Sequence, residues 1–280
     1  MGAAQEVVRV QLAEKLTSAQ IQTSGLVFVY ALQDTQKYKV SKPATLDIRI
    51  TKDGKMQLGA LKKKGSLVII PDKGTLLTFQ NNTYTGSFFA IPKGQTFRLV
   101  EYTPIENYLL GVLPYEMSYS WPLEALKAQA VAARTYTVMH LKNSEAPFDL
   151  YNDVRSQMYK GSGKVYDSVK QAVSQTKGQV LTYQRHLFHT YYHANCGGGT
   201  DDVKIWTGSA AKTPKPLQGV TCDTDRNSKS FSWNVIIPQK AINDFAHQKG
   251  LKGHVNKIKV PCRTARYVAC LKSPPSVCLR

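Results

Sequence analysis

The sequence lacks any apolar run long enough to cross a membrane as a helix. Its first residues, 1–11, also lack the apolar core of a signal peptide. We therefore expect no transmembrane segment in this chain. Two interpretations of its location stay open here: a cytoplasmic protein, or an exported protein whose signal is not part of this sequence.

Acidic residues are scarce. There are 19 Asp and Glu against 37 Lys and Arg, which gives a formal net charge of +18. Such an excess indicates a polyanionic neighbourhood, which could be nucleic acid, anionic lipid or an acidic wall polymer. The densest basic run, at residues 62–64, is typical of a solvated turn. Because no nucleic-acid reader motif accompanies the charge, we expect no nucleic-acid partner.

Cysteines are few, and their number is odd. The five are Cys196, Cys222, Cys262, Cys270 and Cys278. They cannot all pair in disulfides, no two have C-x-x-C spacing, and no histidine lies among the last three. The sequence therefore predicts no structural zinc site, and we expect no metal and no cofactor.

The remaining composition suits a globular protein, with 42% hydrophobic and 10% aromatic residues. Residues 1–100 read as β-rich. Short apolar or alternating runs at 26–31, 45–50 and 66–70 predict strands. Turn-forming residues follow two of them, at 52–55 and 71–74.

Helix signals begin near residue 103. Thr103 as N-cap, Pro104 at the first helical position and Glu106 in a capping box predict a helix that ends at Leu113, before Pro114. Later elements are also predicted: helices at 122–141, 167–176 and 236–250, and strands at 179–183 and 187–194.

The sequence therefore predicts an α+β fold. A β-rich N-terminal region, residues 1–100, would pack with a core of a few helices and strands, residues 101–260, around a substrate groove. The tail, residues 261–280, has little apolar periodicity, and we expect no packed element there.

Glu116 is the strongest candidate for a catalytic residue. The sequence places it on a loop between Pro114 and Pro122, among apolar and aromatic residues. These neighbours are Leu113, Tyr115, Met117, Tyr119 and Trp121. Partial burial favours the neutral form of a carboxyl group, as a general acid requires, and the aromatic rings could stack on sugars. The alternative is a carboxylate that caps a helix or simply faces water.

Two further groups could line a site. Lys127 and Arg134 lie seven residues apart on the predicted helix and so point the same way, either into a groove beside Glu116 or into solvent. Residues 191–200 combine a strand end with a glycine run, as at the rim of a site. A nucleophilic pair of His193 and Cys196 is disfavoured there, because the two would face opposite sides of a strand.

Together these motifs resemble the SpoIID/LytB family, which includes stage II sporulation protein D and amidase-enhancer proteins. The resemblance rests on Glu116-Met117, on the run E-A-L-K-A-Q-A-V-A-A-R-T-Y after Trp121-Pro122, and on three later segments. These segments are 156–161, 176–181 and 192–200. The similarity covers roughly residues 98–235.

The resemblance implies an extracytoplasmic lytic transglycosylase that cleaves peptidoglycan glycan strands already stripped of stem peptides. It assigns the acid/base role to Glu116. It also implies that substrate is contacted by Lys127, Arg134, Gln157, Tyr159 and His193. Two departures stand out: residues 151–156 lack the cysteines that bind zinc in some members, and Cys196 replaces the usual serine before the glycines.

A second interpretation keeps the groove and the charge without catalysis. The chain would then be a peptidoglycan-binding amidase enhancer, with a cell-wall amidase as its partner. A third interpretation, a nucleic-acid binder, rests on charge alone.

Overall fold

The structure is a computed structural model of the 280-residue chain. It describes residues 6–32, 37–143, 145–193, 195–207, 213–224, 226–228, 231 and 236–256, together with the backbone of three short strands beyond residue 261. Its contacts divide the chain into two units, Met1–Tyr192 and His193–Arg280, which are described separately. The predicted limits of the N-terminal region and of the catalytic core stay predictions.

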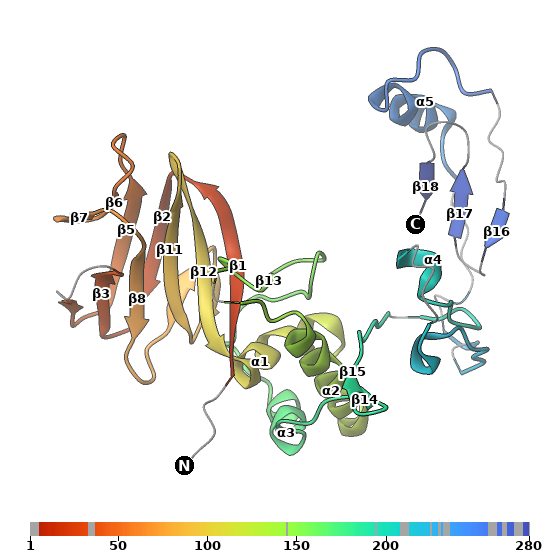
Figure 1. Cartoon of the computed structure of the whole chain (residues 1–280), viewed down its shortest axis with the longest axis horizontal. Helices are drawn as coiled ribbons and strands as arrows, with labels where there is room; N and C mark the ends of the chain where they lie inside the picture. The colour runs from red at the N-terminus through yellow and green to blue at the C-terminus, as the bar shows by residue number, and fades with distance from the viewer. Residues whose placement is uncertain are drawn as a thin grey trace. The chain divides into compact units, whose positions relative to one another are not determined.

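Two sheets dominate the first unit (Figure 1). The larger sheet runs in the order β13-β1-β12-β11-β8-β3-β4, and the smaller in the order β10-β9-β2-β5-β6-β7. The strands of the larger sheet are β1 (Val7–Leu16), β3 (Val27–Ala31), β4 (Tyr38–Val40), β8 (Leu67–Pro71), β11 (Ser87–Lys93), β12 (Thr96–Pro104) and β13 (Leu150–Tyr151). Those of the smaller sheet are β2 (Ser18–Thr23), β5 (Ala44–Ile50), β6 (Met56–Leu58), β7 (Leu61–Lys63), β9 (Leu77–Phe79) and β10 (Asn82–Tyr84).

The predicted strands are present, and the alternation of their side chains explains them. In β5, Leu46 and Ile48 are buried while their neighbours in sequence face outward. Side chains in a strand point alternately to the two faces, so this pattern puts one face of the smaller sheet into the core. Strand β12 pairs with β1 on one side and β11 on the other, and leads directly into the first helix.

Helix α1 (Ile105–Glu116) is longer than predicted, because Pro114 lies inside it and does not end it. Its buried face, which includes Tyr108, Leu109 and Val112, stabilises the helix through packing. The amide of Met117 closes the last turn on the carbonyl of Leu113, at 3.0 Å. Glu116 is therefore the last residue of a helix and does not lie on a loop.

The predicted capping box is also wrong. Pro104 is the N-cap of α1, and no side chain caps the helix. The hydroxyl of Thr103 is buried without a hydrogen-bond partner in the part of the chain that the structure describes. Thr103 belongs to strand β12, and its pairing with Val8 of β1 fixes the backbone in an extended conformation.

Helices α2 (Leu123–Met139) and α3 (Asp167–Gln175) confirm two predictions. Both pack against α1 at one end of the larger sheet (Figure 1). The predicted strand pair after α3 is shorter than expected. It forms a hairpin of two-residue strands, β14 (Thr182–Tyr183) and β15 (His186–Leu187), and residues 188–193 form no regular element.

The second unit holds α4 (Lys204–Thr207), the 3-10 turn η1 (Lys215–Leu217) and α5 (Gln239–Gln248), which confirms the last predicted helix. Residues beyond 261, where no packed element was expected, contain three antiparallel strands. These are β16 (Cys262–Thr264), β17 (Val268–Leu271) and β18 (Val277–Leu279).

The predicted class is confirmed: the fold is α+β and rich in strands. Among the helices of the described residues, none has the length and apolar character needed to span a bilayer.

Candidate active site

Glu116 ends helix α1, and its side chain is half-buried. Its Oε1 accepts a hydrogen bond of 2.8 Å from the backbone amide of Met158. That amide belongs to the segment between β13 and α3, 42 residues further along the chain. A backbone donor holds a carboxyl group in one orientation and stabilises its charged form.

Gln157, which precedes that amide, is buried and acts as the hub of a polar network. Its Oε1 accepts hydrogen bonds from the hydroxyls of Tyr108 and Thr137, at 3.2 and 3.1 Å. Its Nε2 donates to the hydroxyl of Tyr192 at 2.9 Å. Gln157 therefore ties the Met158 segment to both α1 and α2, and its position predicts a structural task beside Glu116.

Tyr159, on the other side of the amide, is buried and donates a hydrogen bond of 2.7 Å to Glu101 Oε2. Glu101 lies in strand β12, and its Oε1 accepts from the amide of Gly86 at 2.9 Å. Burial raises the pKa of Glu101 to about 7, against the opposing effect of these two donors. Burial also raises the pKa of Tyr159 well above its usual value, so the phenol is the donor.

Close backbone packing fixes the same segment from two sides. A methyl group at Gly111 of α1 would collide with the carbonyl of Gly161 and with the ring of Tyr159. One at Gly161, whose φ is +81°, would collide with the carbonyl of Thr83. The segment that carries the Met158 amide is thus wedged between helix α1 and strand β10.

Three tyrosine phenols lie within electrostatic reach of Glu116. Burial raises the pKa of Tyr108, Tyr136 and Tyr192, and the negative charge of Glu116 raises each further. These groups stay protonated at neutral pH and can offer hydrogen bonds to a bound ligand or to each other. The surroundings of Glu116 therefore supply phenol hydroxyl groups as well as aromatic rings.

Lys127 lies on α2 and forms an ion pair of 2.7 Å with Glu124, one helical turn earlier. Both line a hollow of about 400 Å³ between α2 and the segment that follows α3, together with Gln175 and Gln179. Lys127 is therefore accessible from solvent, and its predicted contact with substrate stays a prediction.

Arg134 occupies a different environment from the groove face that its spacing from Lys127 suggested. It is 2% exposed and forms a two-pronged ion pair with Glu106 of α1. Its Nη1 also donates to the carbonyl of Gln179, at 3.1 Å. Its position links α1, α2 and the chain after α3, and a direct contact with substrate stays a prediction.

His193 is exposed and is the first residue of the second unit, while Glu116 lies in the first. Its predicted contact with substrate also stays a prediction. Cys196 and Cys222 lie on facing segments of the second unit, which are joined by the Gly199–Thr221 bridge.

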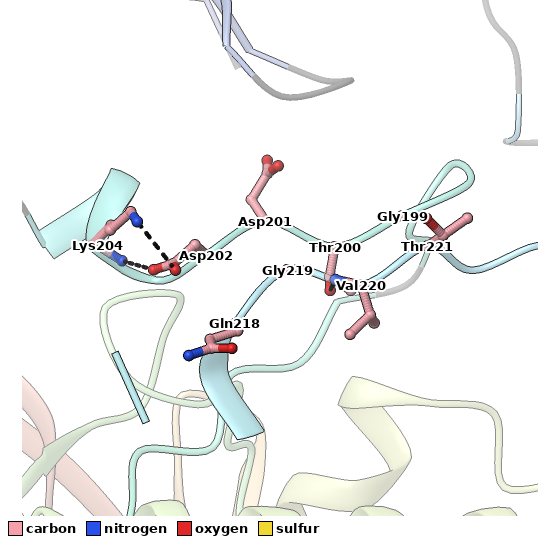
Figure 2. A pocket seen from close by; sticks show the side chains of 9 residues that line it. All are labelled: Gly199, Thr200, Asp201, Asp202, Lys204, Gln218, Gly219, Val220 and Thr221. Carbon is pink, nitrogen blue, oxygen red and sulfur yellow. Dashed lines mark hydrogen bonds and ion pairs between the residues drawn. The ribbon is translucent and has the colours of Figure 1, made fainter. Parts of the chain in front are cut away.

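An open hollow of about 640 Å³ lies in the second unit, where residues 199–204 face residues 218–221 (Figure 2). Asp202 points to Lys204 and accepts a hydrogen bond from Thr213, whereas Asp201 points another way. Within the described ranges, no group of three or more His, Cys, Asp or Glu residues could hold a metal ion.

Sequence reasoning missed three parts of this arrangement: Glu101, Tyr108 and the amide of Met158. Glu101 lies at every second position with Phe97 and Leu99 of β12, so the sequence could have identified it as a carboxylate on the buried face of this strand. The other two gave no signal, because the hydrogen bond of Tyr108 to Gln157 and that of the Met158 amide to Glu116 join segments far apart in the sequence.

The region around Glu116 is similar in sequence to known proteins. Residues 93–183, which include Glu101, Glu116, Arg134 and the Met158 segment, match the family model of the stage II sporulation protein SpoIID. This stretch of the chain is therefore similar to the SpoIID/LytB family.

Three relatives illustrate the match. The chain is 40% identical over 173 residues to an uncharacterized protein of Brachyspira hyodysenteriae, which covers 61% of this chain and 46% of that protein. It is 34% identical over 136 residues to the amidase enhancer of Bacillus subtilis, covering 48% of this chain and 17% of the enhancer. It is 33% identical over 149 residues to stage II sporulation protein D of the same organism, covering 47% and 42%. The matched part of this chain thus spans less than half the length of each of these relatives.

Proposed function

We propose that this protein is a peptidoglycan lytic transglycosylase, with Glu116 as its acid/base. The observation that carries the proposal is the half-buried carboxyl group of Glu116, oriented by the Met158 amide and flanked by exposed aromatic residues. The region that holds it is the one that matches the SpoIID family. On this proposal the substrate is a peptidoglycan glycan strand without stem peptides, and the protein acts in the cell envelope or outside the cell.

The reaction needs one carboxyl group. Protonated Glu116 gives its proton to the glycosidic oxygen as the bond from muramic acid C1 to that oxygen breaks. The resulting carboxylate then takes the proton of the C6 hydroxyl of the same muramic acid, and O6 bonds to C1. The products are a 1,6-anhydro end and a free glucosamine hydroxyl, and no water is consumed. The Met158 amide stabilises Glu116 while it is charged.

Two other glutamates near Glu116 in the sequence are engaged in ion pairs, which supports a mechanism with a single acid/base. Glu106 is held by Arg134 and Glu124 by Lys127, so both are engaged in ion pairs. Ordinary glycosidases need a second carboxylate opposite the first, as base or nucleophile. We assign Lys127 to the substrate and propose that Arg134, Gln157 and Tyr159 act by positioning the elements around Glu116. We also propose that His193 contacts the glycan strand.

A second candidate function is a non-catalytic amidase enhancer with a cell-wall amidase as its partner. The observation that favours it is the 34% identity to a protein named amidase enhancer. It would use the same surface for the glycan strand without proton transfer.

Digestion of amidase-treated, peptide-free glycan strands, followed by mass spectrometry, tests the first proposal. We expect 1,6-anhydro ends with the wild-type protein and none with Glu116→Gln, while binding of the strands is retained. Gln keeps an oxygen that can accept from the Met158 amide, so the variant removes the proton and little else. Absence of anhydro ends with the wild type would favour the amidase enhancer. Stimulation of a cell-wall amidase by both the wild type and Glu116→Gln would support that function.

A further inference from the structure

An exposed aromatic surface adjoins Glu116 and carries two lysines. Tyr115, Tyr119 and Trp121 are 46%, 45% and 52% exposed, which is unusual for rings of this size grouped on one short segment. Neighbouring exposed rings of this kind mark a binding surface more often than chance exposure does.

This surface is ordered. The ring of Tyr119 stacks on that of Tyr166, with centroids 3.8 Å apart and planes 10° from parallel. The hydroxyl of Ser168 on α3 donates a hydrogen bond of 2.7 Å to the carbonyl of Tyr119. The loop between α1 and α2 is thereby fastened to the start of α3, so the free side of Tyr119 forms a fixed, flat platform.

Two ammonium groups lie on the rings. Lys160 Nζ is 5.1 Å from the ring centroid of Tyr115, and Lys164 Nζ is 5.5 Å from that of Tyr166. Both lysines are exposed, and in the part of the chain that the structure describes neither forms an ion pair. Each therefore has donors free for an anion beside an aromatic face.

Lys160 also lies next to the proposed reaction centre, and Lys164 is linked to the same surface through Tyr166 and Tyr119. Tyr115 directly precedes Glu116, and Lys160 is two residues after the Met158 amide that binds Glu116. The ligand that fits is a sugar with a flat apolar face and a carboxylate, lying close to the bond that is cleaved.

Resting on the proposed function, we propose that Lys160 and Lys164 recognise the lactyl carboxylate of peptide-free muramic acid. In an intact strand this carboxyl group is the amide that joins the stem peptide, and it carries no charge. Removal of the peptide frees one carboxylate on every muramic acid. The two ammonium groups lie beside aromatic rings on which a sugar could stack, and they distinguish a charged carboxylate from an uncharged amide. The lysines would therefore determine specificity for strands without stem peptides.

The test uses the full chain as Glu116→Gln, which prevents turnover. Binding is measured by calorimetry with two forms of the same glycan strand: one with free lactyl carboxylates and one in which each carboxylate is capped as a methylamide. We expect the free form to bind about five-fold more tightly at low salt, as two partly exposed ion pairs would give, with a smaller preference at high salt.

Adding Lys160→Ala and Lys164→Ala should remove the preference, whereas Lys42→Ala with Lys73→Ala, which removes the same charge from turns of the β-rich part, should keep it. Tyr119→Ala should weaken both forms alike. Unfolding temperatures establish that each variant is folded. Equal binding of the two forms, no binding of either, or a preference that survives loss of Lys160 and Lys164 would overturn this inference. If the wild type forms anhydro ends but does not prefer strands with free carboxylates, this inference alone is wrong. If it prefers those strands but forms no anhydro ends, only the proposed transglycosylase activity is wrong.

Discussion

Arg134 and Glu106 form a two-pronged ion pair across the interface of α2 and α1, with Nε to Oε1 at 2.9 Å and Nη2 to Oε2 at 2.8 Å. The arginine is almost fully buried, and its other donors reach the carbonyls of Val173 and Gln179. One side chain therefore joins three segments around the candidate site.

We expect Arg134→Met to destabilise the protein by about 3–5 kcal/mol, because it leaves the carboxylate of Glu106 without its buried partner. Urea denaturation measures the change. The double variant Arg134→Met, Glu106→Gln should recover a large part of that loss, since no unpaired charge remains. If Arg134 mainly binds substrate, the single variant would instead keep its stability and show a raised KM.

The Met158 amide can be removed without changing Glu116. Met158→Pro deletes the donor, and we expect the rate of anhydro-product formation to fall about 10- to 100-fold, the effect of losing one hydrogen bond to a charged group. Met158→Ala keeps the amide and is the matched control, with activity near that of the wild type. Circular dichroism of both variants separates a local effect from unfolding. Equal activity of the two folded variants would contradict the proposed orientation of Glu116.

Glu101 should make the stability of the protein depend on pH. Its pKa is about 7 in the folded protein and near 4.5 in an exposed carboxyl group, so the folded state binds this proton more tightly. The stability that this proton contributes to the folded state is therefore fully present below about pH 4.5 and falls as the pH rises towards 7. Above pH 7 it has been lost, and stability no longer depends on this group. The whole change is about 3 kcal/mol.

Comparing Glu101→Gln with the wild type isolates that contribution, since other titrating groups cancel in the difference. We expect the variant to gain stability relative to the wild type between pH 4.5 and 7, measured as unfolding free energies at several pH values. A difference that does not vary with pH would show that Glu101 does not carry a shifted proton.

Gly111→Ala tests the packing of the Met158 segment against α1. In an exposed helix this change would stabilise the protein, because alanine favours the helix by about 1 kcal/mol. Here we expect a loss of about 1–3 kcal/mol, because the new methyl group meets a backbone carbonyl that cannot move easily. Thermal unfolding measures the sign. Gly178→Ala, in open space but at a φ of +73°, reports backbone strain alone.

The sequence predicted the helices and strands that have a clear period, and its choice of Glu116 as the catalytic residue stays a prediction. It placed Glu116 on a loop because proline disfavours a helix locally, whereas packing of the face that contains Tyr108 and Val112 extends α1 through Pro114. Local rules thus misjudged the backbone conformation at Glu116.

Arg134 shows what periodicity cannot predict. Its spacing from Lys127 correctly puts both on one helix, but whether a basic side chain faces water or a buried carboxylate depends on the helix packed against it. Tyr159 and Glu101, 58 residues apart, present the same difficulty. Both pairings are consequences of tertiary structure.

The hydrogen bond from the Met158 amide to Glu116 also has a consequence for the order in which the protein is made. A ribosome releases α1 and α2 before residues 156–163, so a nascent chain already carries the carboxyl group while its donor, the Gln157 hub and the Tyr159 anchor are still to come. The site cannot be assembled by either helix alone. Orientation of Glu116 by this amide therefore requires residues 156–163, and chains cut short after α2 should lack the proposed activity.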